Sequence, residues 1–331
     1  MEFFRTLVPV SVSEKRMYYS SKAILTGSCF SEYIGDKLTE ARFKVDNNPF
    51  GIVYNPLSVK KGLVRLIEAT EYRADDLFLH EQVWYSFDHH SRFSGVDKDA
   101  CLTLMNNRLQ KSAQFLKTVD FLFITFGTSY FYLLKSTGQV VANCHKLPAN
   151  DFQRKRMGID EIVSEYDSLL QQLWSLNPNM HIVFTVSPIR HWKDGAHDNQ
   201  LSKAILLLAI DAICKTHKQV FYFPSYELMM DDLRDYRFYG EDMLHPNTIA
   251  INYIWNRFKE CFMEPDTISL MKEVEKVVQA RNHKPFNPGS EAFQSFARQV
   301  YDKIQYLKEQ YKIDLSEEEN YFKSFFMSHP K

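Results

Sequence analysis

The feature that most constrains the fold is the run at 121–126, which reads Phe-Leu-Phe-Ile-Thr-Phe and ends at Gly127. A half-exposed strand alternates apolar and polar residues, whereas a run that is apolar on both faces predicts a central strand of a covered parallel sheet. The stretch 181–187 has the same character. Helical patterns separate such runs, and this alternation favours parallel pairing. We therefore expect an α/β fold with at least five parallel strands and helices on both faces.

The remaining elements follow from periodicity and from turn residues. Strands are expected at 23–26, 42–46, 121–126, 181–187 and 219–223. Helices are expected at 30–41, 57–70, 97–118, 158–176, 199–217 and 248–263. The stretch 82–87 alternates like an exposed strand or hairpin arm. Two apolar stretches, 130–135 and 139–143, flank a Ser-Thr-Gly turn and predict a β-hairpin insertion.

The pattern changes after Pro265, where long, charged, amphipathic helices are expected at 266–281 and 289–311 and no strand is evident. The sequence thus predicts a main α/β domain over 1–264 and a helical extension over 265–331. The extension would pack on the core or on another subunit, so a homo-oligomer formed through these helices is one expectation.

Composition and charge exclude several classes of protein. The formal net charge of −1 gives no global attraction to nucleic acid. Five cysteines without a CxxC pair favour a reducing compartment, and we expect a cytoplasmic protein. The N-terminus lacks the long apolar region of a signal peptide, and no run approaches a membrane span. A nucleic-acid or membrane partner is therefore not expected.

Polar clusters follow each of the expected sheet strands. They are Ser28, the loop 47–51, the turn 127–129, the segment 187–191 and the loop residues 242–245. In an open parallel sheet, ligands bind beyond the carboxyl ends of the strands. Clusters that recur at this edge predict one functional site there.

Ser28 lies between a strand and a helix in the stretch 23–30, which reads Ala-Ile-Leu-Thr-Gly-Ser-Cys-Phe. At a helix N-terminus, unpaired N–H groups and the helix dipole favour a developing negative charge, so this serine could be a nucleophile. The alternative is that it only caps the helix. Cys29 is a further candidate, because a thiol at a helix N-terminus would have a lowered pKa.

Asp242 and His245 form an Asp-x-x-His pair just before a predicted helix. His245 could take the proton of Ser28 while Asp242 holds the imidazole tautomer and stabilises its charged form. The alternative is that Asp242 caps a turn and His245 merely enters the helix.

These motifs together resemble the GSCFA family, which is allied to the SGNH (GDSL-like) hydrolases. The matching segments are Gly-Ser-Cys-Phe at 27–30, Asn-Cys-His-Lys at 143–146, Ser-Pro-Ile-Arg-His at 187–191, Asn-Gln-Leu-Ser-Lys at 199–203 and Asp-Met-Leu-His-Pro-Asn at 242–247. Ser31 replaces the Ala of the family signature. The resemblance implies a flavodoxin-like, three-layer α/β/α fold with sheet order 2-1-3-4-5 and esterase-type chemistry. It assigns the serine to Ser28 and the last block to Asp242 and His245.

The oxyanion hole matches the SGNH pattern less well. The resemblance places an oxyanion glycine after the second strand, for which Gly51 is the counterpart, and an Asn after the third strand. Here that block is Gly127-Thr-Ser129, without an Asn. A backbone N–H at Gly127, or a side chain of Asn48, Ser129 or Asn143, could replace the missing donor, and Asn143 is the best side-chain candidate. The backbone N–H of Ser28 is expected to contribute.

Several further residues have both a functional and a structural interpretation. Arg190 and His191 could contact an anion or a carbonyl, or could simply end a strand. His145 could contact the substrate or, with His90, His191 and Asp88 or Asp242, hold a metal, but no HxH or HxxxH spacing supports a metal site. No metal and no cofactor are expected. Trp84 and Phe93 could stack on a sugar, although buried packing suits them better.

The leading hypothesis is therefore a serine esterase or deacylase that acts on a small-molecule or carbohydrate acyl ester. The second is a carbohydrate O-acyltransferase that uses the same residues. The third is a non-catalytic binding or scaffold protein with a degenerate site, which the missing Asn and the helical extension support.

Overall fold

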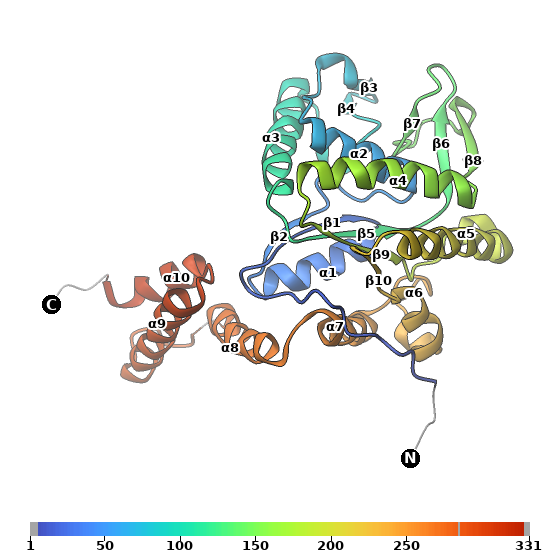
Figure 1. Cartoon of the computed structure of the whole chain (residues 1–331). Helices are drawn as coiled ribbons and strands as arrows, with labels where there is room; N and C mark the ends of the chain where they lie inside the picture. The colour runs from blue at the N-terminus through green and yellow to red at the C-terminus, as the bar shows by residue number, and fades with distance from the viewer. Residues whose placement is uncertain (1–5, 284, 328–331) are drawn as a thin grey trace.

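The computed structural model describes residues 6–283 and 285–327, and its centre is a five-stranded parallel sheet (Figure 1). In spatial order the strands are β10 (Val220–Tyr222), β9 (His181–Val186), β5 (Phe121–Phe126), β1 (Lys22–Gly27) and β2 (Lys44–Asn47). Numbered as sheet strands along the chain, this is the order 2-1-3-4-5, so the prediction of the topology is confirmed. The registers of β1, β5 and β9 place their carboxyl ends at one edge.

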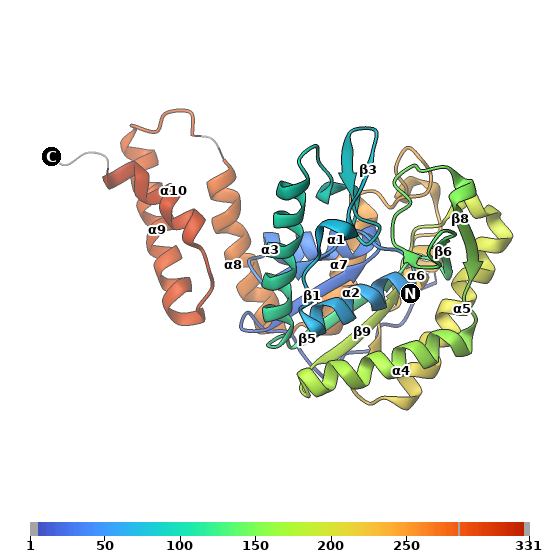
Figure 2. The same cartoon turned by 90° about the horizontal axis from the view of Figure 1, so that it is seen from above.

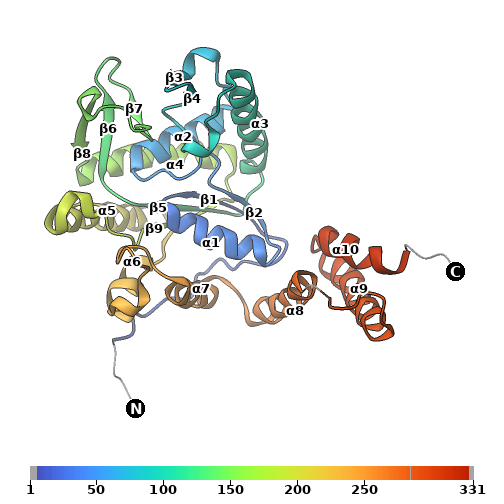
Figure 3. The same cartoon turned by 180° about the vertical axis from the view of Figure 1, so that it is seen from behind.

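Helices cover both faces of the sheet, giving three layers (Figures 1 and 3). One face carries α2 (Pro56–Glu68), α3 (Lys98–Leu116), α4 (Ile159–Leu176) and α5 (Gly195–Thr216). The other carries α1 (Cys29–Glu40), the short α6 (Ser225–Glu227) with the following turns to Asp232, and α7 (Thr248–Phe262). Alternate residues of one strand enter the two cores: Ile124 packs with the first set of helices and Phe123 with the second. Burial on both faces explains the uninterrupted apolar sequence of β5.

Two antiparallel additions lie on the α2–α4 side of the sheet (Figure 1), and Figure 2 shows the molecule from above. The hairpin of β3 (Phe78–His80) and β4 (Val83–Tyr85) comes before α3. The predicted insertion consists of β6 (Tyr130–Leu134) and β7 (Val140–Val141), but a third strand, β8 (Phe152–Arg156), pairs with β6. The polar, mostly exposed sequence of β8 gave no strand signal.

The C-terminal region contains α8 (Pro265–Asn282), α9 (Glu291–Tyr311) and α10 (Ser316–Met327), of which α10 was not predicted separately. These helices extend to one side of the sheet, yet their buried residues belong to the same hydrophobic cluster as α1 and α7. Glu318 of α10 is fully buried and forms ion pairs with Arg42, which precedes β2, and with Arg281 of α8. The division at residue 264 stays a prediction.

Candidate functional site

A pocket of about 280 Å³ lies at the carboxyl edge of the sheet, where three of the polar clusters meet. It brings together Ser28 after β1, the segment after β9, and His245 from the loop before α7. The residues that line it are Ser28, Cys29, Tyr54, Ser187, Ile189, Arg190, His191, Lys193 and His245. The fold therefore gathers residues that are far apart in the sequence at one point.

Ser28 occupies a tight turn between β1 and α1. Gly27 has φ 129°, and a Cβ there would meet the carbonyl oxygen of Thr125 at 2.1 Å, so only glycine fits. Ser28 caps α1, because its Oγ accepts a hydrogen bond from the N–H of Phe30 at 3.3 Å. Capping and the nucleophile hypothesis are compatible, since both need the oxygen at the helix N-terminus. Ser28 is only 1% exposed, and the pocket is its route to solvent.

Asn48 holds the turn that carries Ser28 in place. It is fully buried in a left-handed conformation, with φ 44°, and its Oδ1 accepts the N–H of Gly27 at 3.0 Å. Its backbone N–H donates to the carbonyl of Leu25 at 2.8 Å. The Nδ2 group is enclosed and has no hydrogen-bond partner in the described structure. Asn48 thus links the ends of β1 and β2, but it does not line the Ser28 pocket.

Asp242 and His245 form a compact turn. Oδ1 of Asp242 accepts the backbone N–H groups of Leu244 at 3.0 Å and His245 at 2.9 Å, and Oδ2 contacts His245 Nδ1 at 2.5 Å. These hydrogen bonds, led by the His245 backbone N–H, lower the pKa of Asp242 to about 2, so the carboxylate is ionised at neutral pH. The contact with Nδ1 leaves Nε2 of His245 as the nitrogen that can exchange a proton.

Hydrogen bonds to main-chain groups, rather than burial, hold the loop around this turn. Gly240 N–H donates to the carbonyl of His245 at 2.8 Å, and Met243 has φ 57°. Asn247 caps α7 through Oδ1 and donates from Nδ2 to the carbonyl of Arg237 at 2.8 Å. The side chains of Asp242 and His245 are 48% and 46% exposed.

Ser28 and His245 face the same pocket, but no hydrogen bond joins them in the described residues. Catalytic hydrogen bonds are often long before a substrate binds, so this spacing does not exclude transfer of the Ser28 proton. The assignment of Ser28, Asp242 and His245 stays a prediction.

His191, in the segment after β9, lines the same pocket as Ser28. A Cβ on Gly127 would lie 3.2 Å from its Nε2, so the absence of a side chain at 127 makes room for the imidazole. Tyr54 packs edge-on against the ring, with centroids 5.4 Å apart. Burial, reinforced by Lys203 and other cations, lowers the pKa of His191 to about 3. The ring is therefore neutral at physiological pH and offers one N–H donor.

Lys203, on α5, is fully buried beneath the site. Its Nζ donates to the carbonyl oxygens of Gly127 and Ser187, each at 2.7 Å. It thereby joins the turn after β5 to the turn after β9. Burial without a carboxylate partner lowers the pKa of Lys203 to about 7.

Cys29 does not have the properties expected of a nucleophile. Burial is the main cause that raises the pKa of its thiol to about 11, which outweighs the hydrogen bonds from the helix N-terminus. The expectation of a lowered pKa is wrong for this cysteine. The thiol is protonated at neutral pH and is a poor nucleophile in that form.

The expected backbone oxyanion donors are already engaged in this conformation. The N–H of Ser28 donates to Thr125 O at 3.1 Å, that of Gly51 to Asn48 O at 2.8 Å, and that of Gly127 to Tyr54 O at 2.7 Å. Ser129 is fully buried, and its N–H and Oγ both contact Ser202. In this conformation these donors therefore have acceptors within the protein, and their assignment to the oxyanion hole stays a prediction.

Asn143 and His145 belong to a different part of the molecule. The side chain of Asn143 accepts the N–H of His145 at 2.9 Å and contacts Ser91 at 3.5 Å. His145 Nε2 donates to Ser86 O at 2.7 Å, and its ring packs on Tyr85 beside the β3–β4 hairpin. Neither residue lines the Ser28 pocket. The preference for Asn143 as the replacement donor is therefore not supported by the geometry.

Trp84 and Phe93 pack against the protein and do not line the Ser28 pocket. Phe93 is buried, and Trp84 is half-buried beneath Lys98, so packing accounts for both.

The described residues contain neither a metal-binding cluster nor a membrane-spanning helix. No group of three His, Cys, Asp or Glu side chains suited to a metal occurs within 6–283 or 285–327. In these ranges, no helix combines the length and the apolar character needed to cross a membrane.

Sequence reasoning missed Tyr54, Lys193 and Lys203. A signal for Lys203 was present: it falls on the buried stripe of α5 with Asn199 and Leu206, where a lysine is unusual. Asn199 supports the same region, because its Oδ1 accepts the N–H of His191 at 2.9 Å. Tyr54 lies in a loop without a local pattern, so nothing in the sequence marked it.

Comparison with known protein families identifies two matching regions. Residues 22–258 match the GSCFA family, and residues 274–326 match the C-terminal domain of GSCFA domain proteins. The first match includes every residue of the Ser28 pocket. A search of the curated proteins found no match.

Among solved structures, the chain is distantly similar to several esterases. A carbohydrate esterase family 3 protein from Talaromyces cellulolyticus has a TM-score of 0.35 at 11% identity, over 76% of this chain and 99% of that one. The family 3 carbohydrate esterase of Clostridium thermocellum gives 0.33 at 12%, over 77% and 98%. An acetyl xylan esterase from Butyrivibrio proteoclasticus gives 0.35 at 14%, over 77% and 67%. Similarity at this level carries no functional argument.

Proposed function

The chain belongs to the GSCFA family, and we propose that it hydrolyses acyl esters with Ser28 as the nucleophile. One observation carries this proposal: Ser28, at the N-terminus of α1, shares a pocket with His245. Nδ1 of His245 contacts the ionised carboxylate of Asp242, which leaves Nε2 available. A serine, a histidine and an orienting carboxylate that converge from distant segments are the components of nucleophilic acyl transfer.

In the first half of the proposed reaction, Ser28 Oγ attacks the acyl carbon and its proton passes to His245 Nε2. The Oγ–C bond forms, and the carbonyl π electrons move onto the oxygen. Asp242 stabilises the imidazolium that results. Collapse of the intermediate breaks the bond to the alcohol oxygen, which receives the proton from His245 and leaves.

In the second half, His245 takes a proton from water and the hydroxide oxygen attacks the acyl-enzyme. The Ser28 Oγ–C bond then breaks, and His245 returns the proton to Oγ. The acid is released, and the enzyme regains its starting state. The two half-reactions consume one ester and one water and give one alcohol and one acid.

The proposed oxyanion donor is the neutral His191. The ring lies in the pocket beside Gly127, the block in which the SGNH pattern would have an Asn. Because its pKa is about 3, the imidazole keeps one N–H and adds no positive charge of its own. A neutral donor positioned in a partly enclosed pocket is suited to bind an oxygen whose charge increases during the reaction.

The exposure of the base supports hydrolysis rather than transfer to a second alcohol. The His245 side chain is 46% exposed, so water can reach its nitrogen after the first alcohol has left. An O-acylated carbohydrate stays the predicted class of carrier.

The proposal is tested by screening p-nitrophenyl acyl esters and by fluorophosphonate labelling followed by peptide mass spectrometry. We expect hydrolysis and labelling at Ser28 in the wild-type protein and neither in Ser28→Ala. Loss of a helix cap costs about 1 kcal/mol, so the variant should still fold, which circular dichroism would verify.

Cys29→Ala is the matched control, because it changes the neighbouring residue in the same turn. It should keep most of the activity. Modification of Cys29 by iodoacetamide with a parallel loss of hydrolysis would contradict the assignment of Ser28.

A further inference from the structure

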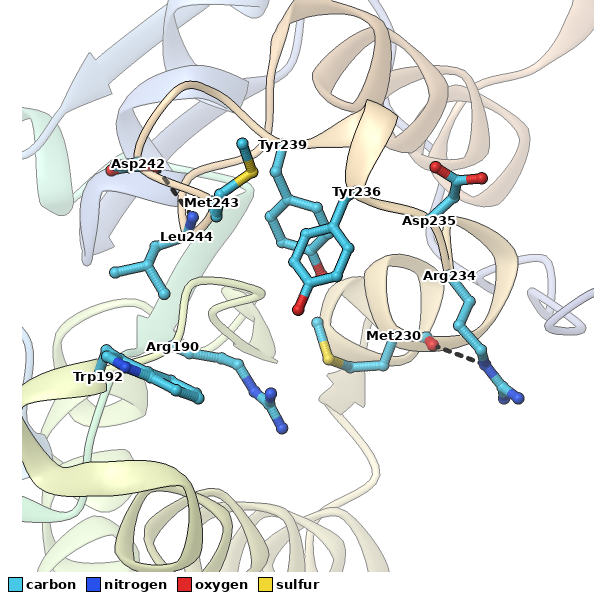
Figure 4. A pocket seen from close by; sticks show the side chains of 10 residues that line it. All are labelled: Arg190, Trp192, Met230, Arg234, Asp235, Tyr236, Tyr239, Asp242, Met243 and Leu244. Atoms are coloured by element: carbon cyan, nitrogen blue, oxygen red, sulfur yellow. Dashed lines mark hydrogen bonds between the residues drawn. The ribbon is translucent and has the colours of Figure 1, made fainter.

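Beside the Ser28 pocket lies a second cavity of about 500 Å³, which shares Arg190 with it (Figure 4). It opens next to the Asp242–His245 turn, and half of its ten lining residues are aromatic or sulfur-containing, while four are charged. Figure 4 shows Arg190, Trp192 and Met230 on one side and Tyr236 and Tyr239 on the other. A substrate whose ester reaches Ser28 can extend into this cavity.

Arg190 differs from other half-buried arginines of the chain. Arg42 and Arg108 each form an ion pair with a carboxylate. In the described part of the chain Arg190 has no such partner, and its buried Nε has no hydrogen-bond acceptor. It interacts with the phenols of Tyr226 and Tyr239 instead. Its charge is therefore not neutralised within the protein.

On the Ser28 side, the surroundings of Arg190 reinforce its positive potential. Lys193 lines the Ser28 pocket as well, and within the described residues no carboxylate lines that pocket. The second cavity has two carboxylates on its wall, but Asp242 is bound to His245 and Asp235 pairs with Arg237. Arg234 donates to Asp231 at 2.6 Å, and in Figure 4 its guanidinium points away from Arg190. Among the described residues, Arg190 is thus the cation that lines both cavities and has no carboxylate partner.

The cavity also exposes apolar surface that a polar sugar alone would leave unused. Trp192, Tyr236 and Met243 are 52%, 74% and 53% exposed. Planar rings and a thioether favour an apolar or planar group, and a guanidinium favours a carboxylate or phosphate.

We propose that the preferred substrate is an ester whose non-reacting part carries an anionic group, bound by Arg190, next to an apolar or planar moiety that packs on Trp192 and Tyr236. This proposal names the substrate class of the function proposed above and rests on it. Its observable consequence is a preference for anionic over neutral esters of similar size.

The kinetic test compares phenyl acetate with 4-acetoxybenzoate and 4-acetoxyphenyl phosphate. We expect kcat/KM to be roughly tenfold or more higher for at least one anionic ester, the size of effect of a hydrogen bond to a charged group. Arg190→Gln should reduce the ratio of anionic to neutral kcat/KM towards one, and Arg190→Lys should restore part of it. The carboxylate and phosphate arms distinguish the two kinds of anion.

Arg298→Gln is the matched control. It removes the same charge from an exposed arginine of α9 that lines neither cavity. It should leave the ratio unchanged. A wild-type ratio of one or less, or an equal loss in Arg190→Gln and Arg298→Gln, would overturn the proposal.

Calorimetric titration of Ser28→Ala with 4-hydroxybenzoate and phenyl phosphate separates this proposal from the proposed function. Binding that Arg190→Gln abolishes supports the anion site even if no ester is hydrolysed. Hydrolysis of esters without a charge preference, together with no binding of either anion, would leave the esterase proposal standing and remove this one.

Discussion

The two halves of the candidate site are held in different ways. On the sheet side, Ser28 and Lys203 are 1% and 0% exposed, and the backbone around them is fixed by β1, β5 and β9. On the loop side, the Asp242 and His245 side chains are about half exposed and are ordered mainly by hydrogen bonds within one turn. The proposed nucleophile is thus part of the core, whereas its proposed base lies on the surface.

This difference separates effects on stability from effects on catalysis. A change on the loop side leaves the core intact, because surface substitutions usually alter stability little. A change on the sheet side affects packing as well as chemistry. Substitutions on the two sides should therefore differ in the ratio of activity lost to stability lost.

The largest separation is expected for His245→Ala. Removal of a general base costs roughly 10²–10⁴-fold in rate, while the free energy of unfolding should change by less than about 0.5 kcal/mol. Ester hydrolysis and urea unfolding of the same preparation measure both. Activity within threefold of the wild type would remove His245 from the mechanism.

Asp242→Asn should lower kcat by roughly 10²-fold, because an amide at this position no longer stabilises the imidazolium. The amide oxygen can still accept the N–H groups of Leu244 and His245, so the turn should persist. A pH–rate profile distinguishes the two roles. Full kcat with an unchanged profile would mean that Asp242 only shapes the loop.

His191→Ala tests a half-buried residue of the pocket, which is intermediate in exposure between the sheet side and the loop side. Loss of one oxyanion donor costs roughly 10²–10³-fold in kcat, with little change in KM. His191→Asn should recover part of the activity, because it restores an N–H donor at the place of the missing Asn. A change in KM alone would indicate that His191 holds the substrate and does not bind the oxyanion.

The smallest effect on activity, and the clearest on stability, is expected for Lys203→Met. The folded-state pKa of Lys203 is lowered to about 7 from the 10.5 of an exposed lysine. From pH 7 to 10 the unfolded chain therefore holds a proton that the folded chain has released, so this residue makes stability rise with pH. Below pH 7 both states are protonated and its contribution is constant.

The measurement is urea unfolding of both proteins at pH 7, 8 and 9. The difference in free energy of unfolding, wild type minus Lys203→Met, should increase with pH by up to a few kcal/mol, because one pKa unit corresponds to about 1.36 kcal/mol. Titrating groups remote from Lys203 affect both proteins alike and cancel, and Cys29, which interacts with Lys203, is replaced by alanine in both proteins. A difference that does not vary with pH would mean that Lys203 stays protonated in the fold.

Most of the sheet could be predicted from the sequence, because burial on both faces leaves a pattern that local residues display directly. Strand β5 has the bounds that its apolar run predicts. Strand β8 and helix α10 could not be predicted in this way, because both are mainly polar. Pairing with β6 stabilises β8, and α10 packs through residues such as Phe322 while Glu318 pairs with Arg42. These are long-range contacts without a local signature.

The same division applies to the site. Ser28 and the Asp242–His245 pair were recognisable because each lies in a short motif with a mechanism. The role of the expected oxyanion donors was not recognisable from the sequence. Whether an N–H group already donates a hydrogen bond depends on carbonyls from distant segments, such as Thr125 O and Tyr54 O. The position of His191 beside Gly127 likewise depends on how β5 and β9 are aligned.

The two acceptors of Lys203 are main-chain carbonyls, which no substitution can delete. Over evolutionary time, residues 127 and 187 are therefore free to change, within their steric limits, without loss of this link between the two turns. Position 203 has no such freedom, because only a long side chain with a terminal donor reaches both oxygens. We expect an alignment of homologues to show a nearly invariant lysine at 203, which would make a residue remote from the reacting atoms one of the best markers of descent in this fold.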